Sequence, residues 1–127
     1  MGLKRILVVE DNPMNLKLVR DILHHSGYEV IEAITGEDGV RLADETVPHL
    51  ILMDLQLPGI DGYEALRQIR ASRRGRDIPA LAVTAFAMQE DRDHAYEYGF
   101  DGYVEKPISV RGLAQKVREL LETGGGS

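Results

Sequence analysis

The stretch Leu50-Ile51-Leu52-Met53-Asp54 decides the fold, because four consecutive apolar residues end in a carboxylate. A strand that is apolar at every position, and not at every second one, is covered on both faces, as in a parallel sheet between helices. Similar runs lie at residues 6–9 and 81–83, with weaker ones at 29–33 and 103–104. The sequence therefore predicts five parallel strands.

Segments of helical length separate these runs. Asn12 before Pro13 is typical of a capping residue followed by the first helical position. Further start signals are Thr35, Asp61 and Ser109, and stop signals are Gly27 and Gly99. Five strands that alternate with five helices predict a doubly wound α/β fold, with right-handed crossovers and helices on both faces of the sheet.

Length and composition exclude several classes of protein. The chain has 127 residues, of which 43% are hydrophobic, and this suits one domain with one packed core. It has no Cys, which excludes disulfides and thiolate metal sites and favours a reducing, cytoplasmic location. A net charge of −6 argues against nucleic-acid binding. The apolar runs are too short to span a membrane, so we expect no membrane association.

Polar side chains follow four of the predicted strands. In an open α/β sheet, ligands bind beyond the carboxyl ends of the strands, where the strand order reverses. Glu10 and Asp11 follow the first strand, Asp54 the third, Thr84 the fourth and Lys106 the fifth. The sequence therefore predicts that three carboxylates, a hydroxyl and an ammonium face one crevice.

This combination favours a particular chemistry. Each residue alone has an ordinary explanation, as a helix cap, a strand former or a solvated cation. Three ionised carboxylates at one edge repel one another, and Lys106 neutralises only part of that charge. Mg²⁺ could neutralise the remaining negative charge, because it binds through a few carboxylates and completes its coordination with water. A carboxylate beside Mg²⁺ can attack phosphorus, with Thr84 donating a hydrogen bond to the phosphate.

With these residues in place, the sequence resembles the receiver domain of two-component response regulators. The motifs that carry the resemblance are Val8-Val9-Glu10-Asp11-Asn12, Leu52-Met53-Asp54-Leu55-Gln56-Leu57-Pro58-Gly59-Ile60-Asp61-Gly62, Val83-Thr84-Ala85 and Val104-Glu105-Lys106-Pro107. The resemblance implies a flavodoxin-like fold with strand order 2-1-3-4-5. Residues 84–88 and 106–110 are most similar to stand-alone single-domain receivers of the cell-division type. We expect residues 1–122 to form the receiver and the Gly-rich residues 123–127 a flexible tail.

The resemblance implies a role for each acidic residue. Asp54 matches the phosphoacceptor of the family. Asp11 and Asp54 match the carboxylates that bind Mg²⁺ directly, and the main-chain carbonyl of Gln56 would be a third ligand. Glu10 would act through a metal-bound water, and it departs from the Asp that many receivers have there.

The resemblance also implies a switch. Thr84 matches the hydroxyl that moves to the phosphate, and Tyr103 the ring that turns inward when it does. Ala85 and Lys106 would contact the phosphate, and the Lys106–Pro107 bond is expected to be cis. Phosphate would enrich the conformation in which Thr84 and Tyr103 are both turned inward, because it binds better to that state.

The expected function is phosphorelay signalling. Asp54 would accept a phosphoryl group from a phosphohistidine of a sensor histidine kinase or a histidine phosphotransfer protein. The protein is then a switch and not an enzyme, since it catalyses only its own phosphorylation and dephosphorylation. Met14, Asn15 and Leu18 are candidates for an exposed docking surface. The resemblance also implies that Gln56 and Phe86 tune hydrolysis, and Phe86 is expected to shield the phosphoryl group from water. Output would be contact with a downstream protein target, by a monomer or a weak dimer.

Other assignments can be weighed against the same motifs. A receiver segment of a hybrid histidine kinase, or of a trimmed multidomain regulator, remains an alternative. A phosphatase of the haloacid dehalogenase kind needs a second Asp two residues after the nucleophile, where this chain has Gln56. A flavodoxin needs a Ser-, Thr- or Gly-rich first loop, where this chain has Glu10-Asp11-Asn12-Pro13. A pseudo-receiver usually lacks the acceptor or the Lys, and both are present.

Overall fold

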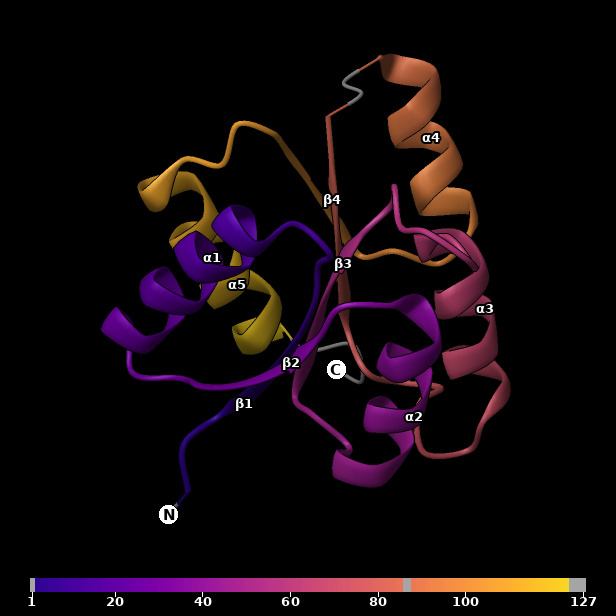
Figure 1. The fold of residues 1–127 in the computed structure, drawn as a ribbon, viewed down its shortest axis with the longest axis horizontal. Coiled ribbons are helices and arrows are strands. Elements are labelled where there is room, and N and C mark those ends of the chain that lie inside the picture. The colour runs from indigo at the N-terminus through magenta and orange to yellow at the C-terminus, as the bar shows by residue number, and fades with distance from the viewer. Residues whose placement is uncertain (1, 86–87, 124–127) are drawn as a thin grey trace.

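The computed structural model describes residues 2–85 and 88–123. Its elements alternate between strand and helix, and Figure 1 shows them around a central sheet. In chain order they are β1 (Arg5–Val9), α1 (Pro13–His25), β2 (Glu29–Ala33), α2 (Gly36–Thr46), β3 (Leu50–Asp54), α3 (Gly62–Ala71), β4 (Ala80–Thr84), α4 (Gln89–Glu97), β5 (Gly102–Glu105) and α5 (Val110–Thr123). Thr123, with which we expected the tail to begin, still belongs to α5; residues 124–127 and Phe86 lie outside the described residues.

The sheet has the order that the sequence predicted. Its strands run β2-β1-β3-β4-β5, and every pairing is parallel. The order reverses between β1 and β3, which are direct neighbours in the sheet. The flavodoxin-like α/β fold is therefore confirmed, and the carboxyl ends of β1 and β3 form its switch point.

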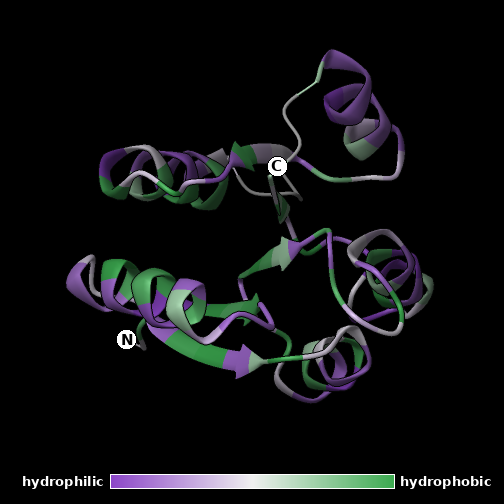
Figure 2. Ribbon diagram, turned by 45° about the horizontal axis from the view of Figure 1, so that its top comes forward, coloured by the Kyte–Doolittle hydropathy of each residue, from purple (hydrophilic) through white to green (hydrophobic). Residues whose placement is uncertain are grey.

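Helices cover both faces of the sheet. Helices α1 and α5 lie on one side, and α2, α3 and α4 on the other (Figure 1). Figure 2 shows the apolar side of several helices turned toward the strands. Residues 50–53 of β3 are at most 2% exposed, and they alternate between the two hydrophobic clusters that fill these layers. This is why the run is continuous: both of its faces are core.

The predicted caps are present. Asn12 Oδ1 accepts hydrogen bonds from the N–H groups of Met14 at 2.9 Å and Asn15 at 3.0 Å. The side chains of Thr35, Asp61 and Ser109 accept from the first turns of α2, α3 and α5. Gly27 and Gly99, after α1 and α4, adopt φ values of 89° and 108°, which glycine reaches without steric cost.

One glycine fixes the start of α3. A Cβ at Gly62 would lie 2.5 Å from the carbonyl oxygen of Asp54 and 2.8 Å from the Cα of Leu55. Only glycine therefore allows α3 to begin directly against the end of β3. This contact places the helix beside the residue that ends the central strand.

Arg70 closes the opposite, amino-terminal edge of the sheet. Its guanidinium donates to the carbonyls of Gly75, Arg76, Ile78 and Gly99, which belong to the two loops that enter β4 and β5. It also forms an ion pair with Asp101 at 3.3 Å, and Asp101 in turn accepts from the N–H of Ala80 at 2.9 Å. One side chain thus ties α3 to both loops.

Helix α4 is attached more sparsely. Of its nine residues, Ala95 alone is buried. The His94 ring lies 4.8 Å from the Tyr63 ring of α3 and 4.7 Å from that of Tyr98, measured between centroids. Ring contacts at its exposed side thus supplement a single buried alanine. No helix in the described part of the chain is long and apolar enough to cross a membrane.

Candidate active site

Two of the predicted acidic residues are buried at the carboxyl edge of the sheet. Asp54, the last residue of β3, is 2% exposed, and Glu10, directly after β1, is 3% exposed. Asp11 is exposed beside them, and each of the three offers a carboxylate oxygen within 4.8 Å of the others. The structure therefore brings together the three carboxylates that the strand pattern predicted.

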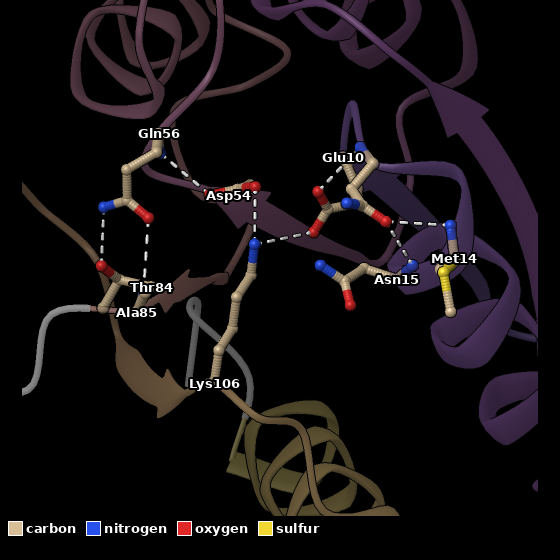
Figure 3. Close-up of polar contacts among 9 residues, drawn as sticks. Glu10, Met14, Asn15, Asp54, Gln56, Thr84, Ala85 and Lys106 are labelled. Carbon is tan, nitrogen blue, oxygen red and sulfur yellow. Dashed lines mark hydrogen bonds and ion pairs between the residues drawn. The ribbon is translucent and has the colours of Figure 1, made fainter.

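Lys106 lies between the two buried acids. Its Nζ is 3.0 Å from Asp54 Oδ2 and 3.4 Å from Glu10 Oε1, as the dashed lines in Figure 3 show. The side chain comes from the loop after β5 and reaches across the end of β4. The Lys106–Pro107 peptide bond is cis, as expected.

Burial and the neighbouring charges displace the pKa values of Glu10 and Lys106. Burial, together with the neighbouring Asp54 carboxyl, raises the pKa of Glu10 from 4.5 to about 7. The N–H of Asn12, 3.1 Å from Glu10 Oε2, and the Lys106 charge offset only part of this. Burial lowers the pKa of Lys106, but its hydrogen bond to Asp54 and the charges of both acids outweigh that effect and raise it.

The donor set fits a hard divalent cation. The cluster offers carboxylate oxygens from Glu10, Asp11 and Asp54, and it has neither imidazole nor thiolate. Hard ions such as Mg²⁺ prefer oxygen ligands, and a second cation would relieve the charge that Lys106 leaves uncompensated. The buried acidic group is therefore suited to bind a metal.

Gln56 connects Asp54 to the end of β4. Its main-chain N–H donates to Asp54 Oδ1 at 2.9 Å, and its side-chain Nε2 donates to Thr84 Oγ1 at 2.7 Å. The N–H of Ala85 donates to Gln56 Oε1 over a longer 3.4 Å (Figure 3). Thr84 is buried at 1% exposure. We expected Gln56 to supply a main-chain metal ligand and to tune hydrolysis. Its side-chain contact with Thr84 was not expected, and it follows from the parallel pairing of β3 and β4 up to Asp54 and Val83.

Tyr103 lies outside this cluster. It is half-buried in β5, packs against the core on the α2–α4 side, and has the Arg92 guanidinium 5.8 Å from its ring centroid. It lines a groove of about 300 Å³ together with Tyr96, Glu105 and Lys116. The two predicted switch residues therefore occupy different surroundings in this structure: Thr84 contacts Gln56, and Tyr103 borders the α4–β5 surface.

The three docking candidates on α1 differ in exposure. Met14 is 82% exposed, and Asn15 is half-buried. Leu18 was expected to be exposed, but it is half-buried and packs against the α1–α5 core. The reason is helical spacing: Leu18 precedes the buried Ile22 by four residues and so lies on the same side of α1.

A family comparison agrees with this fold and site. The sequence profile described as "Response regulator receiver domain" matches residues 6–118. The chain belongs to this family, whose members are signalling switches of two-component systems and not classical enzymes. Such domains interact with histidine kinases or phosphotransfer proteins and with downstream targets.

Individual relatives support the expected subtype. The chain is 42% identical over 118 residues to the polar-differentiation response regulator DivK of Brucella ovis, covering 93% of this chain and 96% of that protein. That relative is thus essentially a single receiver, and the predicted likeness to stand-alone receivers is confirmed.

Solved structures agree as well. The receiver domain of a sensor histidine kinase from Pseudomonas aeruginosa PAO1 is 37% identical, with a TM-score of 0.85 and coverage of 99% and 100%. That structure has a magnesium ion coordinated in its active-site cleft. A CheY-like receiver domain protein from Methanospirillum hungatei JF-1 is 33% identical, with a TM-score of 0.88 and coverage of 96% of each chain.

Proposed function

We propose that Asp54 accepts a phosphoryl group from a phosphohistidine on a sensor histidine kinase or histidine phosphotransfer protein. The observation that carries this proposal is the position of Lys106, whose Nζ lies 3.0 Å from Asp54 Oδ2 inside a cluster of three carboxylates. An ammonium beside a buried acceptor carboxylate holds that carboxylate in place and supplies positive charge where phosphoryl oxygens would gather.

The transfer exchanges one bond to phosphorus for another. A bond forms between Asp54 Oδ and phosphorus while the phosphorus–nitrogen bond breaks, and the departing imidazole takes up a proton. The two hydrogen bonds to the Asp54 carboxylate, from the Gln56 N–H and from Lys106, fix its orientation for the attack. Water later hydrolyses the acyl phosphate and resets the switch.

Mg²⁺ is the proposed cofactor. Asp11 and Asp54 would bind it directly, with the main-chain carbonyl of Gln56 as a third ligand and Glu10 acting through a water. When bound, the ion neutralises charge on the phosphoryl oxygens. The excess of carboxylates supports this assignment. The raised pKa of Glu10 agrees with it, because a carboxyl that is buried beside Asp54 would ionise more readily next to a further cation.

Phosphorylation would act through Thr84, Ala85 and Tyr103. Thr84 ends β4, next to the acceptor strand, and Ala85 follows it directly, which supports a role for both in contacting the phosphate. Tyr103 borders the α4–β5 groove, where a change of its ring would alter a surface available to a downstream protein. Met14 and the half-buried Asn15 lie beside the site, at the start of α1, and are proposed to meet the phosphoryl donor (Figure 3).

Incubation with acetyl phosphate and Mg²⁺, followed by intact-mass measurement, tests the acceptor. We expect one added phosphoryl group on the natural chain, none on Asp54→Ala, and an unchanged adduct on Asp44→Asn, an exposed acid of α2. An adduct that persists in Asp54→Ala, or its absence from the natural chain, would contradict the proposal.

A second candidate is a receiver within a phosphorelay that passes its phosphoryl group onward. The 37% identity to the receiver of a sensor histidine kinase favours it. Mixing the phosphorylated protein with a histidine phosphotransfer domain distinguishes the two functions. Rapid loss of the Asp54 adduct, with phosphohistidine appearing on the second protein, indicates a relay, whereas a stable adduct indicates a switch that acts by contact.

A further inference from the structure

The side chain of Gln56 makes contacts that phosphate acceptance does not require. Its amide spans the gap between β3 and β4 and contacts both Thr84 Oγ1 and the N–H of Ala85. An N–H group can only donate, so the contact with Ala85 assigns the amide oxygen to that side and the amide nitrogen to Thr84. Both ends of the amide are thereby used, and its orientation is determined.

These two partners are the groups proposed above to contact the phosphate. The Ala85 N–H has one hydrogen, which it now gives to Gln56. Thr84 is 1% exposed, and its hydroxyl oxygen accepts from Gln56 at 2.7 Å. A phosphoryl group on Asp54 would therefore compete with a neutral amide for the Ala85 N–H, and a Thr84 hydroxyl that moved to the phosphate would lose its bond from Gln56.

We propose that the Gln56 side chain is a latch that holds the end of β4 in its unphosphorylated arrangement, and that the phosphoryl group switches the protein by displacing it. Gln56 is on this view a positioning residue that sets the equilibrium between the two states. The proposal rests on the proposed function, and it is separate from the main-chain contacts of Gln56.

The latch has a rigid base. The main-chain N–H of Gln56 is bound to Asp54 Oδ1, and the preceding N–H, of Leu55, donates to the Val83 carbonyl at 3.0 Å. The side chain therefore extends from a backbone that is fixed to the acceptor residue and to β4. A rigid base makes the amide an effective competitor, because little further entropy is lost when it binds Thr84 and Ala85.

The phosphoryl group is nevertheless the stronger acceptor. Hydrogen bonds to an ionised acceptor are about twice as strong as those between neutral groups. Displacement of the latch is thus favourable overall. The free energy gained when the phosphoryl group binds is nevertheless reduced by about the net free energy of the neutral hydrogen bonds that break. Removing the amide should make a phosphate mimic bind more tightly.

Binding of beryllofluoride in the presence of Mg²⁺, followed by fluorine NMR on the full chain, tests this at equilibrium and without hydrolysis. Gln56→Met keeps the chain length but removes both polar atoms, and Gln56→Ala removes the side chain. We expect both to lower the dissociation constant about three- to tenfold, the range set by one net neutral hydrogen bond. Gln68→Met, the same change on α3, should leave it unaltered. Equal or weaker binding by the Gln56 variants overturns the latch.

A second measurement needs no ligand. Ala85 is exposed, so protection of its amide hydrogen depends on the Gln56 contact. We expect its exchange in the metal-free protein to accelerate about three- to tenfold in Gln56→Met, as one lost hydrogen bond predicts. Unchanged exchange overturns the latch, even where the natural chain binds beryllofluoride normally. Failure of the natural chain to bind beryllofluoride or to accept phosphate would instead overturn the proposed function, and the switching role of Gln56 with it.

Discussion

The amino and carboxyl edges of the sheet each hold a basic side chain among hydrogen-bond acceptors, but they differ in the balance of positive and negative charge. At the amino edge, the Arg70 guanidinium meets one carboxylate, that of Asp101, and several backbone carbonyls. At the carboxyl edge, Lys106 lies within 3.4 Å of two carboxylates that are almost fully buried, with a third close by. Arg70 thus balances the charge of the one carboxylate beside it, whereas Lys106 leaves negative charge uncompensated.

This difference separates a structural cluster from a functional one. A guanidinium whose N–H groups donate to loop carbonyls has no donors left for a ligand, and its removal destabilises the fold. Buried carboxylates that outnumber the nearby cations destabilise the fold unless a cation or a proton neutralises them. The raised pKa of the buried Glu10 reflects this cost. Counting charges at each edge therefore indicates which cluster awaits a ligand.

The largest expected effect is on chemistry at the carboxyl edge. Lys106→Met removes the ammonium beside Asp54 and should slow phosphorylation by acetyl phosphate about 10²- to 10³-fold, as the loss of one charge-stabilising donor typically does. The rate of adduct formation by intact mass measures this. Lys116→Met, at a half-buried lysine of α5, is the control. A rate within a factor of about two of the natural chain for Lys106→Met would show that the ammonium is dispensable.

At the amino edge the large effect is on folding. Arg70→Met leaves loop carbonyls, some of them partly buried, without their donor and Asp101 without its ion pair, and should lower the free energy of unfolding by about 2–4 kcal/mol. Urea denaturation measures this loss. Phosphorylation of the folded variant should proceed at the natural rate, because Arg70 lies at the other edge. An Arg70→Met variant as stable as the natural chain, or one that folds but is not phosphorylated, would contradict the structural role of Arg70.

The raised pKa of Glu10 predicts a pH dependence of stability. A carboxyl whose pKa is about 7 when folded and about 4.5 when unfolded binds more protons in the folded state between those values. The metal-free protein should therefore lose stability as the pH rises from 5 to 8, by about 1–2 kcal/mol after allowance for solvent screening. Glu10→Gln carries no such proton and should lack this component. Urea denaturation at both pH values compares the slopes, and identical slopes would assign the effect elsewhere.

A divalent cation should reverse that loss. At pH 8, Mg²⁺ at ten times its dissociation constant should stabilise the natural chain by about 1.4 kcal/mol, as expected for a ligand that binds only the folded state. Asp11→Asn removes an exposed carboxylate of the cluster and should weaken this response, whereas Arg70→Met should keep it. Thermal unfolding with and without Mg²⁺ provides the comparison, and an equal shift in all three chains would mean that the ion acts outside the cluster.

Much of the fold was predictable because its signals are local. Strand β3 and helix α3 follow from a continuous apolar run and a capped helix. Strand β5 was recognised only at residues 103–104, since the buried Gly102 and the exposed Glu105 at its ends carry no apolar signal. Helix α4 spans Gln89–Glu97, with Met88 and Tyr98 as its flanking caps, and it ends shortly before the predicted stop signal Gly99.

The site was predictable only in part. Parallel strands bring their carboxyl ends together, so Asp54, Glu10 and Lys106 could be placed at one edge from the order of elements. The contacts of Gln56 with Thr84 and of Arg70 with Gly99 join residues 28 and 29 positions apart, through side-chain conformations that no local pattern encodes. The packing of Leu18 depended likewise on how wide the buried side of α1 is.

The sparse attachment of α4 has a kinetic consequence. A helix with one buried alanine can open without disturbing the sheet, so its amides should exchange with solvent long before those of α1, which buries Leu16, Val19, Ile22 and Leu23. Helix α4 thus forms a separate unit of low local stability. Local opening of α4 would then leave the packing of the sheet and of the other helices unchanged.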